Sequence, residues 1–277
     1  MSGALARHPA SLRDAGPSGQ LIVNADDWGR DARTTQAILD CVELGTVTAV
    51  SAMVFMEDSE RAAALARERR IDAGLHLNFT DRLTSRDCPA PLAERQRGIT
   101  AYLRRHRLAQ LVFNPALMRS FEYVVASQID EYRRIYGAEP ARLDGHHHMH
   151  LCANVLLQGL LPSGTRVRRN FSFQPGEKSA FNRAYRRFVD DRLLRRHQLT
   201  DFLFNLAPLE PPDRLQRIFS LAGQHVIEVE THPVNPDEYR FLTSAEGVRL
   251  ARVFSNGRAT VRPTVPAVPG NGARRAK

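Results

Sequence analysis

The stretch Leu21-Ile22-Val23-Asn24-Ala25-Asp26-Asp27-Trp28-Gly29 runs from an apolar segment directly into two adjacent carboxylates and a glycine. The apolar part has the composition of a buried β-strand. Gly29 permits a sharp turn of the chain after the strand. Helical spacing follows over 34–44, and Gly45 stands where a helix would end. The stretch therefore predicts the first strand and turn of an α/β fold.

The same alternation continues through most of the 277 residues. We expect strands at 21–24, 47–55, 72–77, 141–143, 165–168, 201–205 and 225–231, and helices at 34–44, 59–70, 121–135, 180–196 and 211–222. The segment 81–118 contains Pro89, Pro91 and Pro115 and interrupts the rhythm, which is typical of an insertion over a site. About seven strand–helix units predict an α/β fold, a distorted (β/α) barrel formed by one domain.

The barrel domain is predicted to span 19–261. The flanking segments 1–18 and 262–277 are rich in Gly, Pro, Arg and Ala and show no hydrophobic periodicity. We expect them to form a disordered N-terminal extension and a disordered basic tail.

The composition is that of a globular protein, with 25% charged and 43% hydrophobic residues. No apolar run approaches the roughly 18 residues of a membrane span, so no integral membrane association is expected. The N-terminus also lacks the apolar segment of a signal peptide. The cysteines Cys41, Cys88 and Cys152 are odd in number and widely spaced, which argues against a disulfide framework. We therefore expect a cytoplasmic protein.

The formal net charge of +9 comes mainly from arginines that are spread along the predicted helices. No stripe of interleaved aromatic and basic residues of the kind that stacks nucleic-acid bases is present. We therefore expect solvated helix surfaces and no nucleic-acid partner. The sequence leaves the oligomeric state open, including a homodimer.

Four of the ten histidines lie in Asp144-Gly145-His146-His147-His148-Met149-His150. Neutral imidazole is the commonest protein ligand of divalent metal ions, and a neighbouring carboxylate adds a further donor. A histidine tract can also be a purification tag or a solvated loop. This one is internal and follows the predicted strand 141–143, which favours a metal site.

In a (β/α) barrel the catalytic groups come from the C-terminal ends of several strands. The candidates here all lie at the C-terminal ends of predicted strands or directly after them: Asp26, Asp27, His76, Asp144, His146, Glu230 and His232. Taken singly, the Asp pair could cap a helix, and His76 or His232 could be a structural histidine. Their common position at strand ends favours one shared site, in which one carboxylate binds a cation and its neighbour accepts a proton from water.

Four motifs resemble, in order, those of the YdjC-like carbohydrate deacetylases, a family that includes chitooligosaccharide deacetylases and the deacetylase associated with hopanoid biosynthesis. The motifs are Asn24–Gly29, Gly74-Leu75-His76-Leu77, Asp144–His150 and Thr231-His232-Pro233. The resemblance covers about 20–250. It implies a barrel similar to that of polysaccharide deacetylases.

The resemblance also implies site roles. One divalent metal ion would be held by Asp27, His76 and His146, with Asp26 as the general base and His232 as the general acid. The remaining histidines of the cluster would orient ligands or line the pocket; they are His147, His148 and His150. The implied activity is hydrolysis of the acetamide of an N-acetylated sugar or glycolipid by metal-activated water.

One carboxylate with two imidazoles suits Zn²⁺, and the resemblance leaves Mg²⁺ equally open. Trp28, Gly145 and Val234 depart from residues that are common in the family, and these departures bear on the shape of the pocket and hence on the substrate. None of them removes an implied ligand.

Two alternatives remain open at the level of the sequence. Another metal-dependent barrel enzyme, such as a phosphoesterase or a sugar isomerase, uses the same ligand types, and the surplus histidines would suit a second metal ion. A basic binding module without enzymatic activity would instead bind DNA or RNA in a strongly salt-dependent way.

Overall fold

The computed structural model describes residues 19–106, 108–173, 179–211 and 213–255. The predicted flanking segments 1–18 and 262–277 lie outside these residues, and the domain limits of 19–261 stay a prediction. Among the described residues, no helix combines the length and the apolar composition needed to cross a bilayer.

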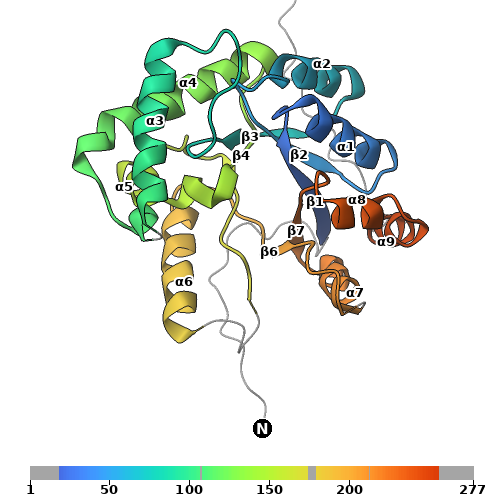
Figure 1. The fold of residues 1–277 in the computed structure, drawn as a ribbon. Helices are drawn as coiled ribbons and strands as arrows, with labels where there is room; N and C mark the ends of the chain where they lie inside the picture. The colour runs from blue at the N-terminus through green and yellow to red at the C-terminus, as the bar shows by residue number, and fades with distance from the viewer. Residues whose placement is uncertain (1–18, 107, 174–178, 212, 256–277) are drawn as a thin grey trace, which may run out of the picture.

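Seven parallel strands form one curled sheet in the spatial order β5-β4-β3-β2-β1-β7-β6 (Figure 1). Their bounds are β1 (Gln20–Trp28), β2 (Ala49–Ala52), β3 (Ala73–Leu77), β4 (Arg142–Gly145), β5 (Arg166–Val167), β6 (Phe202–Asn205) and β7 (Val226–Thr231). At the open side, a single bridge joins Arg166 of β5 to Gln198, which lies shortly before β6. The predicted distorted barrel is therefore confirmed as a curled half-barrel.

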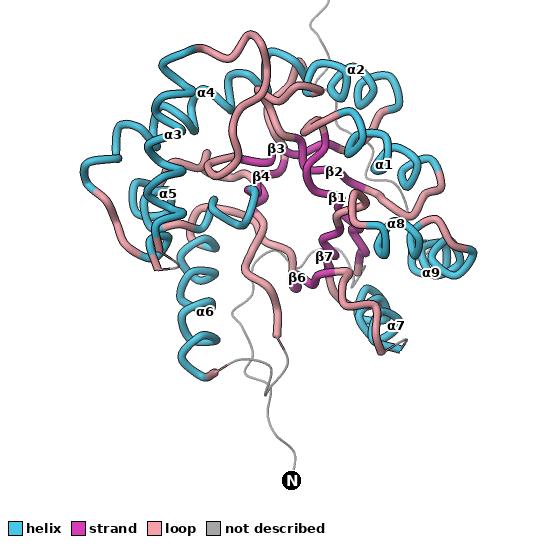
Figure 2. Tube along the Cα trace, in the orientation of Figure 1, coloured by secondary structure: helices cyan, strands magenta, loops and turns pink. Residues whose placement is uncertain are grey.

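Helices surround the sheet (Figure 2). They are α1 (Ala32–Glu43), α2 (Ser59–Arg69), α3 (Ala90–Arg105), α4 (Met118–Tyr136), α5 (Ala153–Gln158), α6 (Ala180–Leu194), α7 (Asp213–Ser220), α8 (Pro236–Leu242) and α9 (Ala245–Ser255). Short 3₁₀ helices lie at η1 (Ala109–Leu111), η2 (Pro115–Leu117), η3 (His146–Leu151) and η4 (Leu221–Gly223).

The observed elements differ from the predicted ones mainly at their ends. β1 continues through the acidic pair to Trp28, so both carboxylates lie in the last residues of the strand instead of after it. β2 is shorter than the predicted strand 47–55, because the apolar residues Met53–Met56 form a buried loop. The helix α3 lies within 81–118, which was predicted as an insertion, and the helices α5, α8 and α9 were not predicted.

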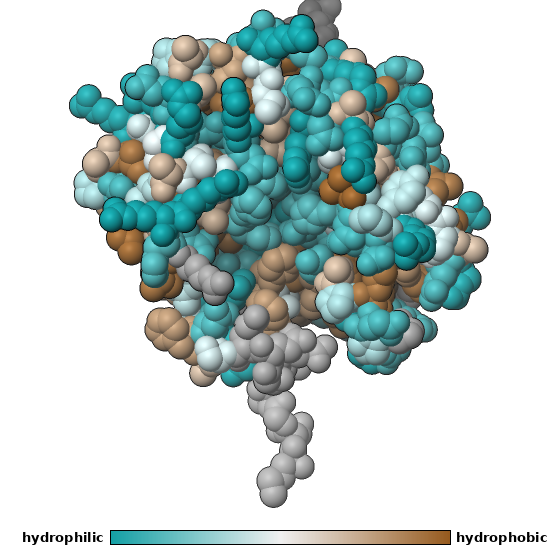
Figure 3. Space-filling view, in the orientation of Figure 1, coloured by the Kyte–Doolittle hydropathy of each residue, from teal (hydrophilic) through white to brown (hydrophobic). Residues whose placement is uncertain are grey.

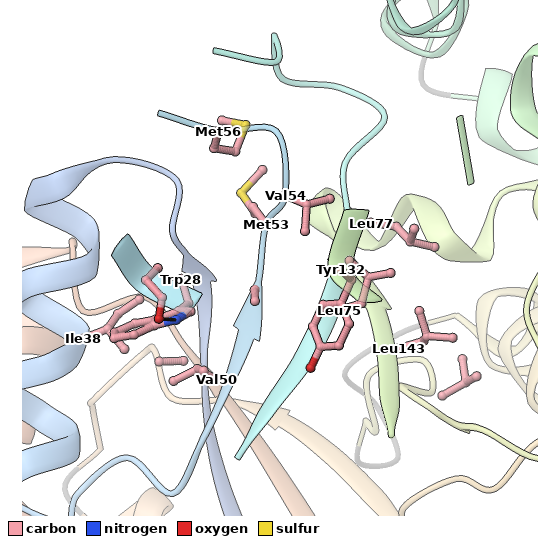
Figure 4. Close-up of a cluster of buried hydrophobic side chains, with 14 of the residues drawn as sticks. Trp28, Ile38, Val50, Met53, Val54, Met56, Leu75, Leu77, Tyr132 and Leu143 are labelled. Carbon is pink, nitrogen blue, oxygen red and sulfur yellow. Dashed lines mark hydrogen bonds between the residues drawn. The ribbon is translucent and has the colours of Figure 1, made fainter. Parts of the chain in front are cut away.

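The two faces of the sheet differ in polarity because successive side chains of a strand point to opposite faces. One face packs against the helices and is apolar: Leu75 and Leu143 lie beside Tyr132 of α4 in the hydrophobic core (Figure 4). The alternate residues, such as Asn24 and Ser51, are polar and equally buried. The concave side of the half-barrel is therefore filled by polar side chains.

Candidate active site

Buried polar side chains from six of the strands and the residues that follow them make one connected cluster in the curl of the sheet. The cluster consists of Asn24, Asp26, Asp27, Ser51, His76, Asp144, His146, Arg168, Glu228 and Glu230. Most of these residues alternate with the apolar core residues of their strands. Because buried polar groups need hydrogen-bond partners, their mutual contacts define the site.

Asp27, His76 and His146 come together although more than a hundred residues separate the first from the last. The Asp27 Oδ1 atom lies 2.9 Å from His146 Nδ1 and 3.4 Å from His76 Nε2. One donor atom of each residue lies within 4.8 Å of the others. The structure thus brings together the three residues that the sequence predicts to hold a metal. Two of their potential ligand atoms, Asp27 Oδ1 and His76 Nε2, are buried and have no hydrogen-bond partner.

The backbone at Asp27 explains how two consecutive carboxylates reach the same site. Neighbouring residues of a regular strand point to opposite faces. Asp27 instead has a left-handed φ of 69°, and the register of β1 against β2 shifts between Ala25 and Trp28. The irregularity brings Asp27 to the side of Asp26. Such a conformation costs about 1–3 kcal/mol in a non-glycine residue and is typically kept at functional sites.

The second ring nitrogen of His76 is fixed by Asp144. His76 Nδ1 lies 2.8 Å from Asp144 Oδ1, and the other oxygen of Asp144 accepts hydrogen bonds from Ser51 Oγ at 2.5 Å and Arg168 at 3.0 Å. Donation from Nδ1 leaves Nε2 directed at Asp27. This carboxylate–histidine arrangement is the one that orients metal-binding imidazoles.

The charges around His76 favour a cation at this position. Burial lowers the pKa of His76, but Asp26, Asp144 and Asp27 together raise it well above its ordinary value. At Asp27, burial raises the pKa, yet the contacts with His146 and His76 bring it below the ordinary range. A carboxylate set that holds a proton on an imidazole also attracts a metal ion, and metal binding would release that proton.

Asp26 is held by Arg168. The guanidinium makes a bidentate contact with Asp26, at 2.6 Å from Oδ2 and 2.8 Å from Oδ1. Asn24 donates a further hydrogen bond to Oδ1 at 2.8 Å. Oδ2, which keeps a free lone pair, lies 3.9 Å from His76 Nε2. The carboxylate is therefore fixed in orientation with one oxygen available beside the candidate metal site.

The cluster carries a surplus of negative charge. Arg168 is 3% exposed and is the one fully buried arginine among the described residues. Besides Asp26 and Asp144 it contacts Glu228 at 2.7 Å and Glu230 at 3.1 Å. Burial raises the pKa of Glu228, and the attraction of Arg168 offsets this rise only in part. Since buried carboxylates outnumber the buried guanidinium, a divalent cation would fit the electrostatics of the site.

His147, His148 and His150 make separate contacts. His147 Nδ1 lies 2.9 Å from Thr80 Oγ1, and His148 Nε2 lies 3.2 Å from Glu230 Oε2. His150 is buried and its Nε2 donates to the backbone carbonyl of Arg168 at 3.0 Å. Their roles beside the ligands stay predictions. His147 and His146 also form a second acidic–imidazole group with Asp81.

His232 reaches the same site from β7 but keeps its side chain 33% exposed. One atom each of Asp26, Glu230 and His232 lie within 4.8 Å of one another. Glu238 of α8 accepts hydrogen bonds from the His232 backbone N–H at 2.8 Å and from Thr231 Oγ1 at 2.7 Å. The loop that carries His232 is thus tied to α8, and the imidazole faces both the cluster and solvent.

Three cluster residues, Ser51, Arg168 and Glu228, were missed in the sequence, and so was Asp81, which lies beside the cluster. Arg168 ends the predicted strand 165–168, and Glu228 stands two positions before Glu230, so both carried the strand-end or alternation signal that found the others. Asp81 lies in a loop, and its Oδ2 reaches within 3.2 Å of His146 Nε2. No local pattern indicates that contact.

The family of this chain follows from a comparison with models of known protein families. The family model described as YdjC-like protein matches residues 20–258. The chain belongs to the YdjC-like family. The sequence resemblance is thereby confirmed over nearly all of the described residues.

The similar proteins include two that are named as deacetylases. A carbohydrate deacetylase of Mus musculus is 29% identical over 164 residues, which are 55% of this chain and 51% of that protein. A chitooligosaccharide deacetylase of Proteus mirabilis is 30% identical over 136 residues, 49% of this chain and 51% of that protein. The chain thus spans about half the length of these relatives.

The fold also resembles a solved structure, described as a cellobiose-phosphate cleavage protein of Enterococcus faecalis. The TM-score is 0.56 at 17% sequence identity, over 86% of this chain and 95% of that one. At this sequence identity, the likeness concerns the fold only and does not extend to the function.

Proposed function

We propose that this YdjC-like protein is a metal-dependent carbohydrate deacetylase that hydrolyses the acetamide of an N-acetylated sugar or glycolipid. The observation that carries the proposal is the convergence of the acidic pair Asp26–Asp27, the imidazoles of His76 and His146, and the solvent-facing His232. The names of the similar proteins support a carbohydrate amide as substrate.

The residues that would hold the metal are Asp27, His76 and His146. The close spacing of one atom from each residue, the unsatisfied Asp27 Oδ1 and His76 Nε2, and the acidic surplus of the cluster support this assignment. A divalent ion, Zn²⁺ or Mg²⁺, would lower the pKa of bound water and polarise the acetamide oxygen.

In this proposal Asp26 accepts the proton of the attacking water. Oδ2 keeps a lone pair for that proton, and the bidentate contact with Arg168 holds the carboxylate in one orientation. Arg168 acts here as a positioning residue because it contacts the base and not the substrate.

His232 donates a proton to the departing nitrogen. The amine is a poor leaving group unless it is protonated as the carbon–nitrogen bond breaks. Its partial exposure gives His232 access to a bound substrate, and an imidazolium there would face the carboxylates of Asp26 and Glu230.

A phosphoesterase fits the charges less well. Phosphate esters are usually held by free arginine or lysine groups. Arg168 is fully engaged by carboxylates, and the other arginine at the site, Arg30, is paired with Asp27 and Asp31. A neutral acetamide requires no such basic group.

The cytoplasmic location is part of the same proposal. Cys41, Cys88 and Cys152 are all free thiols, which agrees with a reducing compartment.

The test is acetate release from N-acetylglucosamine oligomers by the metal-loaded protein. We expect activity that a chelator abolishes and that Asp26→Asn reduces by about 10²–10⁴-fold while metal binding is kept. His232→Gln should also reduce the turnover number while metal binding is kept.

His225→Gln is the matched control, because His225 is a partly exposed histidine that contacts Phe202 away from the cluster. Full activity of Asp26→Asn would contradict the role of Asp26. Phosphate release without acetate release would replace the deacetylase by a phosphoesterase.

A further inference from the structure

The outward face of α6 exposes two phenylalanines. Phe181 is 83% exposed and Phe188 is 64% exposed. They are two helical turns apart and so lie on the same face, with the exposed Ala184 between them. The opposite face of α6 is already packed, since Val189 and Leu193 are buried. The exposed phenylalanines are therefore not needed for the core of this domain.

The same helix is surrounded by positive charge. Over 180–196, four arginines are exposed: Arg183, Arg187, Arg195 and Arg196. One acidic side chain is exposed there, that of Asp191. The other acidic residue of α6, Asp190, is buried and pairs with Arg169 at 2.7 Å. The charge of the arginines thus remains available to a partner outside the domain.

We propose that the outward face of α6, formed by Phe181, Ala184, Arg187 and Phe188, with Arg183 at its edge and Asp191 also exposed on it, docks the protein on the surface of an anionic phospholipid bilayer. Exposed aromatic residues beside arginines on one helix are typical of interfacial attachment, in which rings enter the acyl boundary and guanidinium groups contact phosphates. The helix stands at the lower left edge of the molecule in Figure 1. Attachment of this helix to a bilayer requires no complementary groove, because the lipid surface is fluid.

Charge decides between this occupant and a second copy of the chain. Two copies that met through this face would bring their arginines together, which is unfavourable. An anionic bilayer offers phosphates to every arginine and a fluid apolar layer to both rings. In Figure 3, teal and brown residues adjoin along the edge of the surface where α6 lies.

A row of contacts connects α6 with the candidate active site. The guanidinium carbon of Arg186, on α6, lies 4.9 Å from the ring centroid of Phe173. The ring centroids of Phe173 and Phe171 are 6.4 Å apart, and those of Phe171 and His148 are 4.7 Å apart. Docking through α6 would therefore bring the site near the bilayer, whichever substrate the site takes. The docking proposal does not rest on the deacetylase activity.

Cosedimentation of the full chain with vesicles tests the proposal. We expect binding to vesicles containing about one third phosphatidylglycerol at about 0.1 M salt, and much weaker binding to pure phosphatidylcholine. Phe181→Ser with Phe188→Ser should lower the partition coefficient by about tenfold or more. Arg183→Gln with Arg187→Gln should lower it by a similar factor on the anionic vesicles alone.

The controls change equivalent residues elsewhere. Val253→Ser removes another exposed apolar side chain, 59% exposed on α9, and Arg33→Gln with Arg252→Gln removes two exposed arginines of α1 and α9. Both should bind like the wild type, and all variants should keep the wild-type melting temperature. No binding by the wild type, as expected if α6 docks on an acidic protein instead, would overturn the proposal. Equal binding by the phenylalanine variant would also overturn it.

Discussion

Arg168 is the residue on which the buried acidic cluster depends. Its guanidinium contacts four carboxylates from three strands: Asp26, Asp144, Glu228 and Glu230. The attraction between these charges is strong because all five residues are buried and bulk water screens them little. Burial alone would lower the pKa of Arg168, but the four carboxylates raise it well above the ordinary value. The guanidinium therefore stays charged and holds the site together.

Replacing Arg168 by leucine should destabilise the protein by about 3–5 kcal/mol, because buried carboxylates would lose their cationic partner. Denaturant unfolding measures this change. Arg168→Lys keeps the charge and should lose less. The comparison is Arg240→Gln, which breaks an exposed pair with Asp237 and should cost at most about 1 kcal/mol. An Arg168→Leu protein as stable as the wild type would show that the cluster is not held by this residue.

His150 gives a pH dependence to stability. Burial, together with the charge of His148, lowers the pKa of His150 to about 3 in the folded protein, against 6.5 for a free histidine. Between these values the unfolded chain binds a proton that the folded protein does not. The contribution of the neutral His150 to the free energy of unfolding is therefore complete above pH 6.5. It is lost as the pH falls toward 3, by up to about 1.4 kcal/mol per pH unit.

A His150→Gln variant should lose less stability between about pH 6.5 and pH 5 than the wild type, by about 2 kcal/mol. Urea unfolding at each pH measures the slope. Glutamine keeps an N–H donor for the Arg168 carbonyl but does not titrate. Because the carboxylates titrate in both proteins, the difference between the slopes isolates His150. Parallel slopes would be inconsistent with a buried neutral imidazole.

At the scale of elements, the turn from β1 into α1 places the acidic pair. Asp31 caps α1 by accepting a hydrogen bond from the Thr34 N–H at 2.7 Å. Trp28 is fully buried and donates from its indole to the Ala62 carbonyl at 3.2 Å. Gly29 between them has a φ of 87°. The strand-to-helix unit was predictable because its signals are local. The extension of β1 to Trp28 was not, because it depends on the pairing of Trp28 with Ala52 of β2.

Gly29→Ala should cost more stability than Gly45→Ala. Both glycines have positive φ, so alanine is strained at either position by about 1–2 kcal/mol. A Cβ at Gly29 would also lie 3.2 Å from Ala62 Cβ and from the Met53 carbonyl oxygen, whereas nothing lies within 4 Å at Gly45. The difference between the two free energies of unfolding measures the effect of crowding. Equal losses would mean that the turn at Gly29 is free to relax.

For the whole molecule, the half-barrel is a scaffold with an apolar convex side and a charged concave side. Strands of parallel sheets usually carry apolar residues on both faces. Here the concave residues form an ionic cluster that a cation would stabilise. Metal binding and folding should therefore be coupled.

Zn²⁺ or Mg²⁺ should raise the melting temperature of the wild-type protein. At about a hundred times the dissociation constant, binding adds about 2.7 kcal/mol, which corresponds to about 5–10 °C for a domain of this size. A chelator should reverse the shift. His76→Ala should show little shift, whereas His225→Gln should respond like the wild type. A wild-type melting temperature that neither ion changes would contradict the metal site.

The sequence by itself determined the order of the seven strands, five of the helices and the chemical types at the strand ends, because hydrophobic periodicity and turn residues act over a few positions. It was sufficient to single out Asp26, Asp27, His76, His146 and His232. Only the tertiary structure decided which of these groups meet and what holds them. The contacts of Arg168 with Asp26, and of Asp81 with His146, join segments far apart in the chain. The first contact crosses the curl of the sheet from the end of β5 to β1, and the second joins the segments that follow β3 and β4, which are neighbours in the strand order. That order is set by the burial of the whole apolar face and by no single segment.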